Sequence, residues 1–328
     1  MFKKFFFFLS FCIVSFVAPA QFFLPVGDDP FAVPISFNAA GVMQNKVKSI
    51  TATIQYKPDG KIIMDKGLRE FYRFDSMGRL NYYWRTKIRS YTSERVEHGA
   101  IYKKGKRVHS AYSELKTQYT YDTTFVNYYF DYKNQLSCRR ACEGDYYYAW
   151  YYIYNTDGTL ARQTHCRETN NGRDHFDFRL GVQTVISQED FIYEIYSITQ
   201  IKKLCLNDEG KPYKETMLVY DMTGHLLDSR ESYTAGGIRI VTTWKYDKFG
   251  RNLQLTYTSN AGDAIADITN FSYDSLGRIE SMKRFHNSVL LDEFSYLYEK
   301  SSPFANAYIN RRHIDLGIDI VKFTVIYW

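Results

Sequence analysis

Apolar and polar residues alternate with a period of two along most of the chain, and the alternation restarts after each short turn. The clearest case has apolar or aromatic side chains at every second position in 238–246 and again in 253–257, on either side of a turn at 247–251. Such alternation on both sides of a turn predicts an antiparallel β-hairpin. Between Ile50 and the C-terminus the turn spacing predicts roughly sixteen to nineteen strands.

Many of the turns share one sequence form, in which an aromatic residue precedes Asp or Asn and Gly follows a few positions later. The stretch FSYDSLGRIESM, residues 271–282, is representative. Asp or Asn opens a type I turn by bonding its own backbone, and Gly takes the positive φ that a three-residue loop with a bulge requires. The predicted structural turn residues are Asp59, Gly60, Asp75, Gly78, Asn155, Gly158, Asp221, Gly224, Asp247, Gly250, Asp274 and Gly277.

The predicted fold is all-β, a long antiparallel meander of these hairpins forming a curled or layered sheet. Thirty tyrosines and 24 phenylalanines supply side chains suited to the half-buried face of a sheet. Since strands reverse at each turn, the aromatic-Asp-Gly turns should lie along one edge and the other turns along the opposite edge. A sheet of this many strands should curl, split into layers or close. The segment 187–206 is β-branched and aromatic enough to favour strand over helix.

Two copies of the turn carry a resemblance to a known family. Tyr246-Asp247-Lys248-Phe249-Gly250-Arg251 and Tyr273-Asp274-Ser275-Leu276-Gly277-Arg278-Ile279 resemble the YD repeats of the Rhs and teneurin families, and the other copies have lost Tyr, Asp or Arg. The resemblance covers residues 48–300. It implies YDxxGRL hairpins in spiralling β-sheet, and for this chain a small, divergent, exported form without the full function of the large shells.

The first twenty residues have the pattern of a secretory signal peptide. Lys3 and Lys4 precede an apolar stretch that ends at Val17, and Ala18-Pro19-Ala20 is a small-residue site, so cleavage is expected before Gln21. We therefore divide the chain into a signal peptide (1–20), an irregular lead segment (21–47) and a YD-repeat-like β domain (48–328). No later stretch approaches the roughly 18 apolar residues that a transmembrane helix needs. The expected location is periplasmic, outer-membrane-associated or extracellular.

The small net charge of the chain argues against a nucleic-acid partner. The chain has a net charge of +6, of which the leader's two lysines account for two.

The number of cysteines permits disulfides. Four cysteines follow the leader: Cys138, Cys142, Cys166 and Cys205. On one strand, Cys138 and Cys142 would be about 13 Å apart, beyond the roughly 7 Å that a disulfide allows, so each should pair with Cys166 or Cys205.

His165, Glu168 and His175 form the most metal-like cluster. If Asn171-Gly172 is a two-residue turn, Glu168 lies opposite His175, which is an ordinary cross-strand contact. The spacing matches no standard zinc pattern, so neither a metal nor a cofactor is predicted.

The sequence holds no nucleophile elbow, phosphate loop or dinucleotide fingerprint, and its recurring acids have structural roles in turns. Aromatic-rich strands such as 145–154 could present rings to a glycan or protein partner if one face stayed exposed. We therefore predict an exported, non-enzymatic β-repeat scaffold or binding protein of the bacterial cell envelope.

Two alternatives remain, an outer-membrane β-barrel and an envelope hydrolase that uses paired carboxylates. Asp267 shares a strand face with Phe271 and Tyr273, which counts against the apolar band of a membrane barrel. Arg278 is the motif residue that the turn explains least, and we expect it to be an edge-strand charge that blocks sheet-to-sheet pairing.

Overall fold

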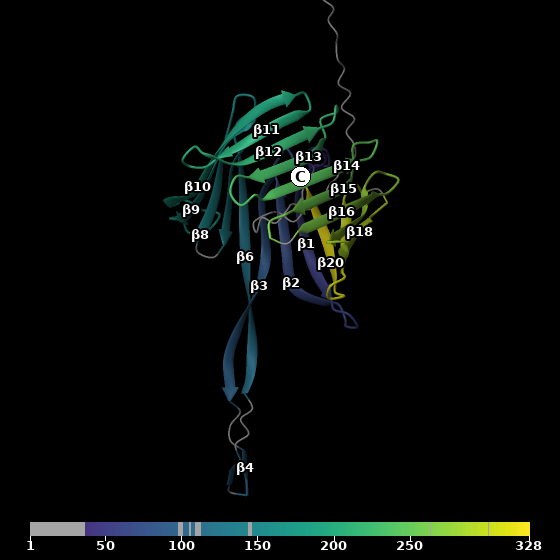
Figure 1. The fold of residues 1–328 in the computed structure, drawn as a ribbon. Coiled ribbons are helices and arrows are strands. Elements are labelled where there is room, and N and C mark those ends of the chain that lie inside the picture. Colours follow the sequence, from purple (N-terminus) through teal and green to yellow (C-terminus); the bar gives the residue numbers. More distant parts are fainter. Residues whose placement is uncertain are drawn as a thin grey trace, which may run out of the picture.

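The protein is almost entirely antiparallel β-structure, in accord with the predicted all-β class. The computed structural model describes residues 37–97, 101–104, 106–108, 113–143, 146–262, 264–300 and 302–328 (Figure 1). The predicted signal peptide, 1–20, lies outside these residues, and the end of the predicted lead segment forms a short helix. The elements are α1 (Ala39–Gln44), β1 (Val47–Lys57), β2 (Met64–Phe74), β3 (Leu80–Glu97), β4 (Ile101–Lys103), β5 (Lys106–Val108), β6 (Ser113–Phe130), β7 (Leu136–Glu143), β8 (Tyr146–Tyr154), β9 (Leu160–Asn170), β10 (Leu180–Ser197), β11 (Gln200–Leu206), β12 (Pro212–Tyr220), β13 (Leu226–Tyr233), β14 (Arg239–Tyr246), β15 (Asn252–Ser259), β16 (Ile265–Tyr273), β17 (Ile279–His286), β18 (Val289–Tyr298), β19 (Ala305–Arg312) and β20 (Ile318–Tyr327).

Eighteen of these strands form one closed ring. Each strand pairs with the next along the chain from β6 to β20, and β1, β2, β3 and β6 continue the series. The ring closes where β1 pairs with β20, with registers from Val47↔Tyr327 to Lys57↔Ile318. The sheet is therefore a closed β-barrel, a more specific form than a curled or layered sheet and the form that the membrane-barrel alternative requires.

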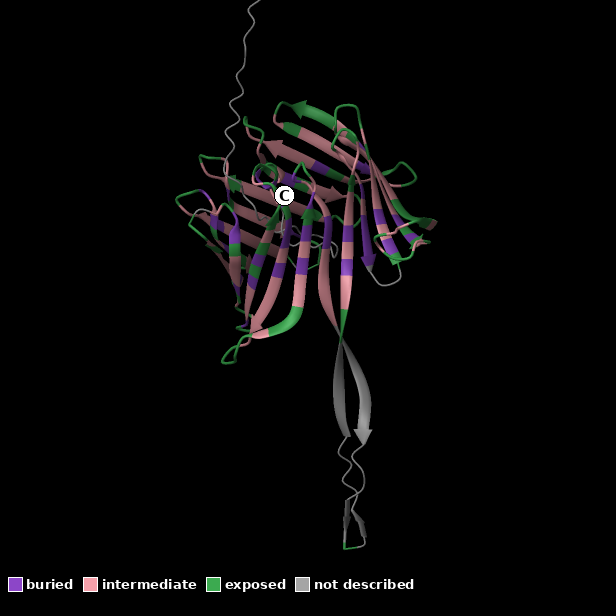
Figure 2. Cartoon of the chain, turned by 180° about the vertical axis from the view of Figure 1, so that it is seen from behind, coloured by how far each residue is buried: buried purple, intermediate pink, exposed green. Residues whose placement is uncertain are grey.

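The core of the protein lies on the inner face of this barrel. Residues that pair across neighbouring strands share a face, and the ladder Ile50↔Tyr72↔Tyr83↔Val126↔Ala141 crosses five strands on the buried side. Val42 of α1 belongs to the same cluster, so the helix packs against that side. In Figure 2 the buried positions appear as bands across the strands. Aromatic side chains thus make up much of this core.

The outer face of the barrel carries charged pairs that bridge neighbouring strands. Lys202 on β11 pairs with Glu215 on β12 at 2.9 Å, and Lys283 on β17 pairs with Glu293 on β18 at 3.2 Å. These residues alternate with inward-facing neighbours along each strand. Asp267, by contrast, lies on the inner face, where its carboxylate is 2.6 Å from Nδ1 of His286. Asp267 therefore does not interrupt an outward apolar band, and it does not count against a membrane barrel.

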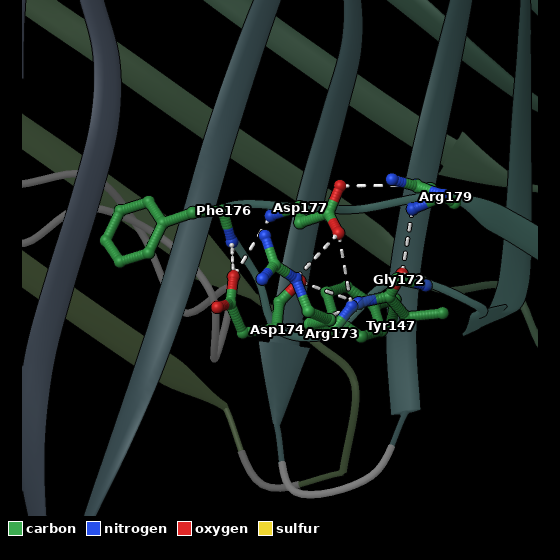
Figure 3. A network of polar contacts seen from close by, with 8 residues as sticks. Tyr147, Gly172, Arg173, Asp174, Phe176, Asp177 and Arg179 are labelled. Carbon is green, nitrogen blue, oxygen red and sulfur yellow. Dashed lines mark hydrogen bonds and ion pairs between the residues drawn. The ribbon is translucent and has the colours of Figure 1, made fainter.

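Two strands and one loop depart from the regular barrel wall. β3 and β6 are 18 residues each and continue as a paired ribbon beyond one end of the barrel (Figure 1). Between β9 and β10, residues 171–179 form a loop that folds back on itself (Figure 3). The carboxylate of Asp174 accepts the backbone N–H groups of Phe176 and Asp177, and Asn170 Oδ1 accepts those of Gly172 and Arg179.

The segment 187–206 is strand as predicted, forming part of β10 and all of β11. Among the described residues, no helix is long and apolar enough to cross a membrane.

Candidate binding cleft at the barrel rim

Most of the aromatic-Asp-Gly turns lie at one end of the barrel, which we call the turn rim. Alternate strands of an antiparallel ring run in the same direction, so the turns after β2, β6, β8, β12, β14 and β16 share this end. The turn at Asp59-Gly60 follows β1 and lies at the opposite end, as does the turn at 207–210 after β11, a weaker copy in which Leu206 stands in place of the aromatic residue. The prediction of a single edge is therefore wrong for these two turns, because they follow strands of the other direction.

Most turns on the rim are held by the aspartate that opens them. Asp274 Oδ1 accepts the backbone N–H groups of Leu276 and Arg278, both at 2.9 Å. The N–H of Gly277 donates to the Asp274 carbonyl at 3.0 Å. Corresponding backbone bonds form at Asp75, Asn155, Asp221 and Asp247. The glycines with positive φ include Gly60, Gly78, Gly158, Gly224, Gly250 and Gly277.

The arginine after the glycine joins its own turn to the next one along the rim. Arg278 Nε donates to Asp274 Oδ2 at 2.7 Å, and its guanidinium lies 4.3 Å from the centroid of the Tyr298 ring. The Tyr298 hydroxyl in turn donates to the Ile279 carbonyl at 2.9 Å. Arg278 therefore clamps successive hairpins, and the predicted edge-strand role is wrong because all eighteen strands of the ring are paired on both sides.

The same clamp recurs at the two preceding turns. Arg251 lies 4.6 Å from the ring of Tyr273, whose hydroxyl donates to the Asn252 carbonyl at 2.6 Å. At the turn before that, a histidine takes the place of arginine, and His225 stacks on Tyr246 at 4.9 Å. Sequence reasoning missed this coupling, although the recurrence of a basic or histidine side chain after the glycine was its signal.

Three consecutive turns of the rim surround an open cleft of about 1060 Å³. The turn after β12 contributes polar side chains, the turn after β14 aromatic and basic ones, and the turn after β16 an aliphatic one. The residues that line it include Asp221, Thr223, His225, Trp244, Lys245, Lys248, Phe249 and Leu276.

The polar side chains of the first turn are bonded to one another. Thr223 Oγ1 and Asp221 Oδ2 lie 2.7 and 3.0 Å from the same ring nitrogen, Nδ1 of His225. A catalytic triad requires the nucleophile and the acid on opposite ring nitrogens, so this arrangement does not activate the threonine. The hydrogen bond from the Thr223 hydroxyl, with further bonds from His225, holds the pKa of Asp221 far below its usual range.

The carboxylate of Asp247, which opens the second turn, is also hydrogen-bonded within its own turn. Burial would raise the pKa of this carboxyl, but the side-chain bond from Arg251 and backbone bonds to the turn outweigh burial and lower it. Both carboxylates thus stay ionised and hold their turns. They do not form the pair with separated pKa values that acid–base catalysis requires.

Apolar and cationic side chains make up the accessible part of the cleft. Phe249 is 61% exposed and Leu276 57% exposed, while Trp244 is half-buried on the inner side of the rim. Lys248 Nζ lies 5.0 Å from the centroid of the Phe249 ring, and Lys245 is exposed on the outer face of β14, opposite to Trp244. Among the residues that the structure describes, no carboxylate lies within ion-pair distance of either lysine.

The residues of the metal-like cluster are not brought together. His165 lies on the inner face and stacks on Trp150 at 4.5 Å. Glu168 is buried on the outer face, and His175 belongs to the loop at 171–179, stacked 3.8 Å from Phe125. In the described ranges, no three His, Cys, Asp or Glu side chains are placed to hold a metal ion.

The predicted pairing of Glu168 with His175 is wrong. Glu168 pairs with Gln183, because the loop at 171–179 bonds to itself where a two-residue turn was expected.

The four cysteines are buried and form no disulfide in the described part of the chain, where disulfides were predicted. Cys138 and Cys142 lie on β7 and Cys166 on β9, and the strand β8 between them imposes a separation of about 9.5 Å, beyond the reach of a disulfide. Cys205 pairs with Phe191 on the inner face, whereas the other three are on the outer face. Burial raises the pKa of Cys138 to about 11.

The aromatic-rich strand β8 does not present a continuous aromatic row. Its inward residues Tyr148 and Trp150 face the barrel interior, and Tyr147 lies under Phe178 of the loop at a centroid distance of 4.9 Å. The exposed rings at the turn rim are therefore better placed for a ligand.

No family model and no curated protein matches the sequence. Solved structures with some similarity include a porin-like protein from Bacteroides uniformis ATCC 8492, 10% identical with a TM-score of 0.37, covering 86% of this chain and 97% of that one. A porin-like protein from Bacteroides vulgatus ATCC 8482 is 8% identical with a TM-score of 0.27, covering 63% and 94%. The TcdB2-TccC3-Cdc42 structure is 10% identical with a TM-score of 0.19, covering 81% and 22%. At these TM-scores the conclusions rest on the strand pairing and side chains of this chain alone.

Proposed function

We propose that this chain is an exported, non-enzymatic β-barrel of the bacterial cell envelope that binds a ligand in the cleft at its turn rim. The observation that carries the proposal is the cleft itself, which is open, of ligand-binding size and lined by exposed aromatic and aliphatic side chains. Export is supported by the leader-like pattern of residues 1–20.

Binding without chemical conversion is supported by the state of the carboxylates in the cleft. Asp221 and Asp247 both bond to their own turns and stay ionised, so neither is available as a general acid. The exposed ring of Phe249 and the half-buried ring of Trp244 offer flat apolar surfaces of the kind that stack on sugars.

The outer face of the barrel supports a location in water. Ion pairs such as Lys202–Glu215 and Lys283–Glu293 lie on the side that a membrane barrel would turn toward lipid. Charged residues on that face are destabilising near the bilayer midplane by about 2–4 kcal/mol each for lysine or arginine. A water-filled envelope compartment would impose no such cost.

We also propose that the chain is a divergent YD-repeat protein. The tyrosine, aspartate, glycine and arginine of the motif each have a contact at the rim that would explain why the four residues occur together. The proposal rests on the two close copies at 246–251 and 273–279.

An outer-membrane β-barrel is the second candidate, and closure of the ring is the observation that favours it. Only helices and closed barrels satisfy every backbone hydrogen bond within a bilayer. A spanning barrel would remain in the pellet after a carbonate wash and would change its gel mobility on heating. A barrel in water would be released and would not show the mobility shift.

The test uses the mature chain with a C-terminal tag, expressed with its leader, in the wild-type form and as two variants. Phe249→Ala removes a ring from the cleft, and Tyr132→Ala removes a ring that is 90% exposed at another turn of the same rim. We expect release into a soluble envelope fraction, and capture of envelope glycan that Phe249→Ala weakens and Tyr132→Ala does not. Retention in the cytoplasm, or cleavage of envelope polymers by the wild-type protein, would overturn the proposal.

A further inference from the structure

We infer that two copies of this chain associate edge to edge through residues 180–188 of β10, in an antiparallel pairing centred on Thr184. These residues form the half of β10 that lies away from the turn rim, so the surface is separate from the cleft. In Figure 1, β10 lies with β8 and β9 at the left side of the molecule.

β10 pairs with its two neighbours along different halves of its length. β9 pairs with it from Leu180 to Asp190, and β11 pairs with it from Asp190 to Ser197. β11 then ends at Leu206 and the chain turns back into β12. In the described part of the chain, no strand pairs with the edge of 180–188 that points away from β9. Since the N–H and C=O groups of a strand alternate between its two edges, about half of those in this segment point to that edge.

The segment 180–188 is apolar, uncharged and exposed. Leu180, Val182, Val185 and Ile186 are between 50% and 68% exposed. The remaining residues are Gly, Gln, Thr and Ser, so the segment has neither the charges nor the proline with which exposed strand edges are usually protected. An edge of this kind is what β-strand addition requires, because backbone groups supply hydrogen bonds and apolar side chains supply contact area.

The irregularities of the segment favour a second copy over a regular strand. Its ladder with β9 shifts register between Leu180 and Gln183 and again between Val185 and Ser187. The two shifts lie on opposite sides of Thr184 at similar distances from it. Antiparallel pairing of two copies about Thr184 therefore places each shift opposite the other one. A regular strand would meet both shifts as mismatches.

The charges that flank the segment also fit this pairing. Residues equally far from Thr184 lie opposite each other, so Arg179 of one copy meets Glu189 of the other, with opposite charges at both ends. Arg179 is 71% exposed, and its pair with Asp177 at 3.2 Å is partly exposed and therefore weak. Glu189 accepts a hydrogen bond from the Tyr213 hydroxyl. Such an interface has twofold symmetry, as most homodimers do.

The first test is sedimentation velocity on the mature chain. We expect a small edge interface to give a dimer fraction that rises between about 1 and 100 µM. Thr184→Lys and Thr184→Glu each place like charges opposite one another and should weaken self-association about tenfold. An equimolar mixture of the two variants should associate about as tightly as wild type, because opposite charges then face each other.

The matched control is Thr256→Lys. Thr256 lies on β15 and is paired with Thr243 on one side and with Ile268 on the other, so no edge is open there. This variant should self-associate as wild type does. An unchanged melting temperature for each variant verifies folding.

The second test is cross-linking under a mild oxidant, which determines the register. Thr184→Cys places the two thiols directly opposite each other, with α-carbons about 4.5–5.5 Å apart, within disulfide range. Val182→Cys is the control, because Val182 is 68% exposed but its counterpart lies about 13 Å along the partner strand. We expect a covalent dimer of Thr184→Cys, and none of Val182→Cys or of wild type, whose cysteines are buried.

Three outcomes would overturn the inference. The first is a wild-type chain that stays monomeric throughout the concentration range, which would leave the edge to a segment of a different protein. The second is a mixture of Thr184→Lys with Thr184→Glu that associates no better than either variant alone. The third is cross-linking of Val182→Cys as readily as Thr184→Cys, which would indicate random collision. None of these outcomes bears on ligand binding in the rim cleft.

Discussion

Replacement of Glu168 by glutamine should destabilise the protein more than any other single change in an ion pair of the barrel wall. Glu168 is fully buried and accepts hydrogen bonds from Arg140 Nε at 2.7 Å, from Gln183 Nε2 at 2.8 Å and from the Tyr151 hydroxyl. The Arg140 side chain is only 10% exposed and lies 4.0 Å from the Phe178 ring. The substitution leaves this cation buried without a counter-ion, which costs about 3–5 kcal/mol.

The effect should depend on pH with a definite sign. Burial would raise the pKa of Glu168, but the bonds from Arg140, Tyr151 and Gln183 outweigh burial and lower it. A carboxyl with a lowered folded-state pKa stabilises the fold above its ordinary pKa of about 4.3, and that stabilisation is lost as pH falls toward the folded-state value. Urea denaturation followed by tryptophan fluorescence should therefore show wild type losing stability below that pH more steeply than Glu168→Gln.

A matched control is available between the same strand, β9, and its neighbour β10. Asp190→Asn removes the partner of Arg162 in a pair whose side chains are 31% and 43% exposed, and should cost less than about 1 kcal/mol. The double variant Arg140→Met/Glu168→Gln should be more stable than Glu168→Gln alone, because no buried charge remains. A cost below about 1 kcal/mol for Glu168→Gln, or additive effects in the double variant, would refute the reasoning.

Three further predictions concern the rim and the cysteines. Tyr273→Phe should lower the free energy of unfolding by about 1 kcal/mol, measured by urea denaturation, because it removes the hydroxyl that bonds the Asn252 carbonyl; no change would show that the clamp is not stabilising. Gly250→Ala should lower the melting temperature more than Gly224→Ala. Both have positive φ, but the added Cβ would lie 2.8 Å from the His225 ring only at Gly250, and equal shifts would contradict that contact. The four buried cysteines should resist a thiol reagent in the native protein and react after urea unfolding, whereas non-reducing peptide mapping that finds cross-linked peptides would restore the disulfide prediction.

The local parts of this fold could be predicted from the sequence because their causes lie within a few residues. The turn at 274–277 forms because Asp274 bonds the two N–H groups that follow it and Gly277 adopts a φ of +80°. The alternation of apolar and polar residues on either side of the turn then predicts the two paired strands. Nothing beyond the hairpin is needed for that inference, so strands such as β14 and β15 lie close to where the pattern places them.

The remaining features depend on residues that are distant in sequence. Closure needs Val47 to pair near Tyr327, and no local pattern encodes that contact. The role of Arg278 depends on a tyrosine two strands further on, and the cleft exists only because three such turns meet at one rim. The loop at 171–179 is held by hydrogen bonds from its own N–H groups to Asn170. The pair Asn171-Gly172 predicts a two-residue turn and gives no indication of this longer loop.

The pairing of β1 with β20 has a consequence for the order in which the protein folds. Every other pairing in the ring except that of β3 with β6 joins strands linked by a short connection, whereas this seam joins segments at opposite ends of the described chain. Closing a loop of that length costs about 3 kcal/mol more entropy than closing a hairpin of about ten residues. The hairpins should therefore form first and the seam last, so a chain still emerging from a translocation channel would expose two unpaired strand edges until β20 arrives. Such an intermediate is the natural substrate for a holding chaperone.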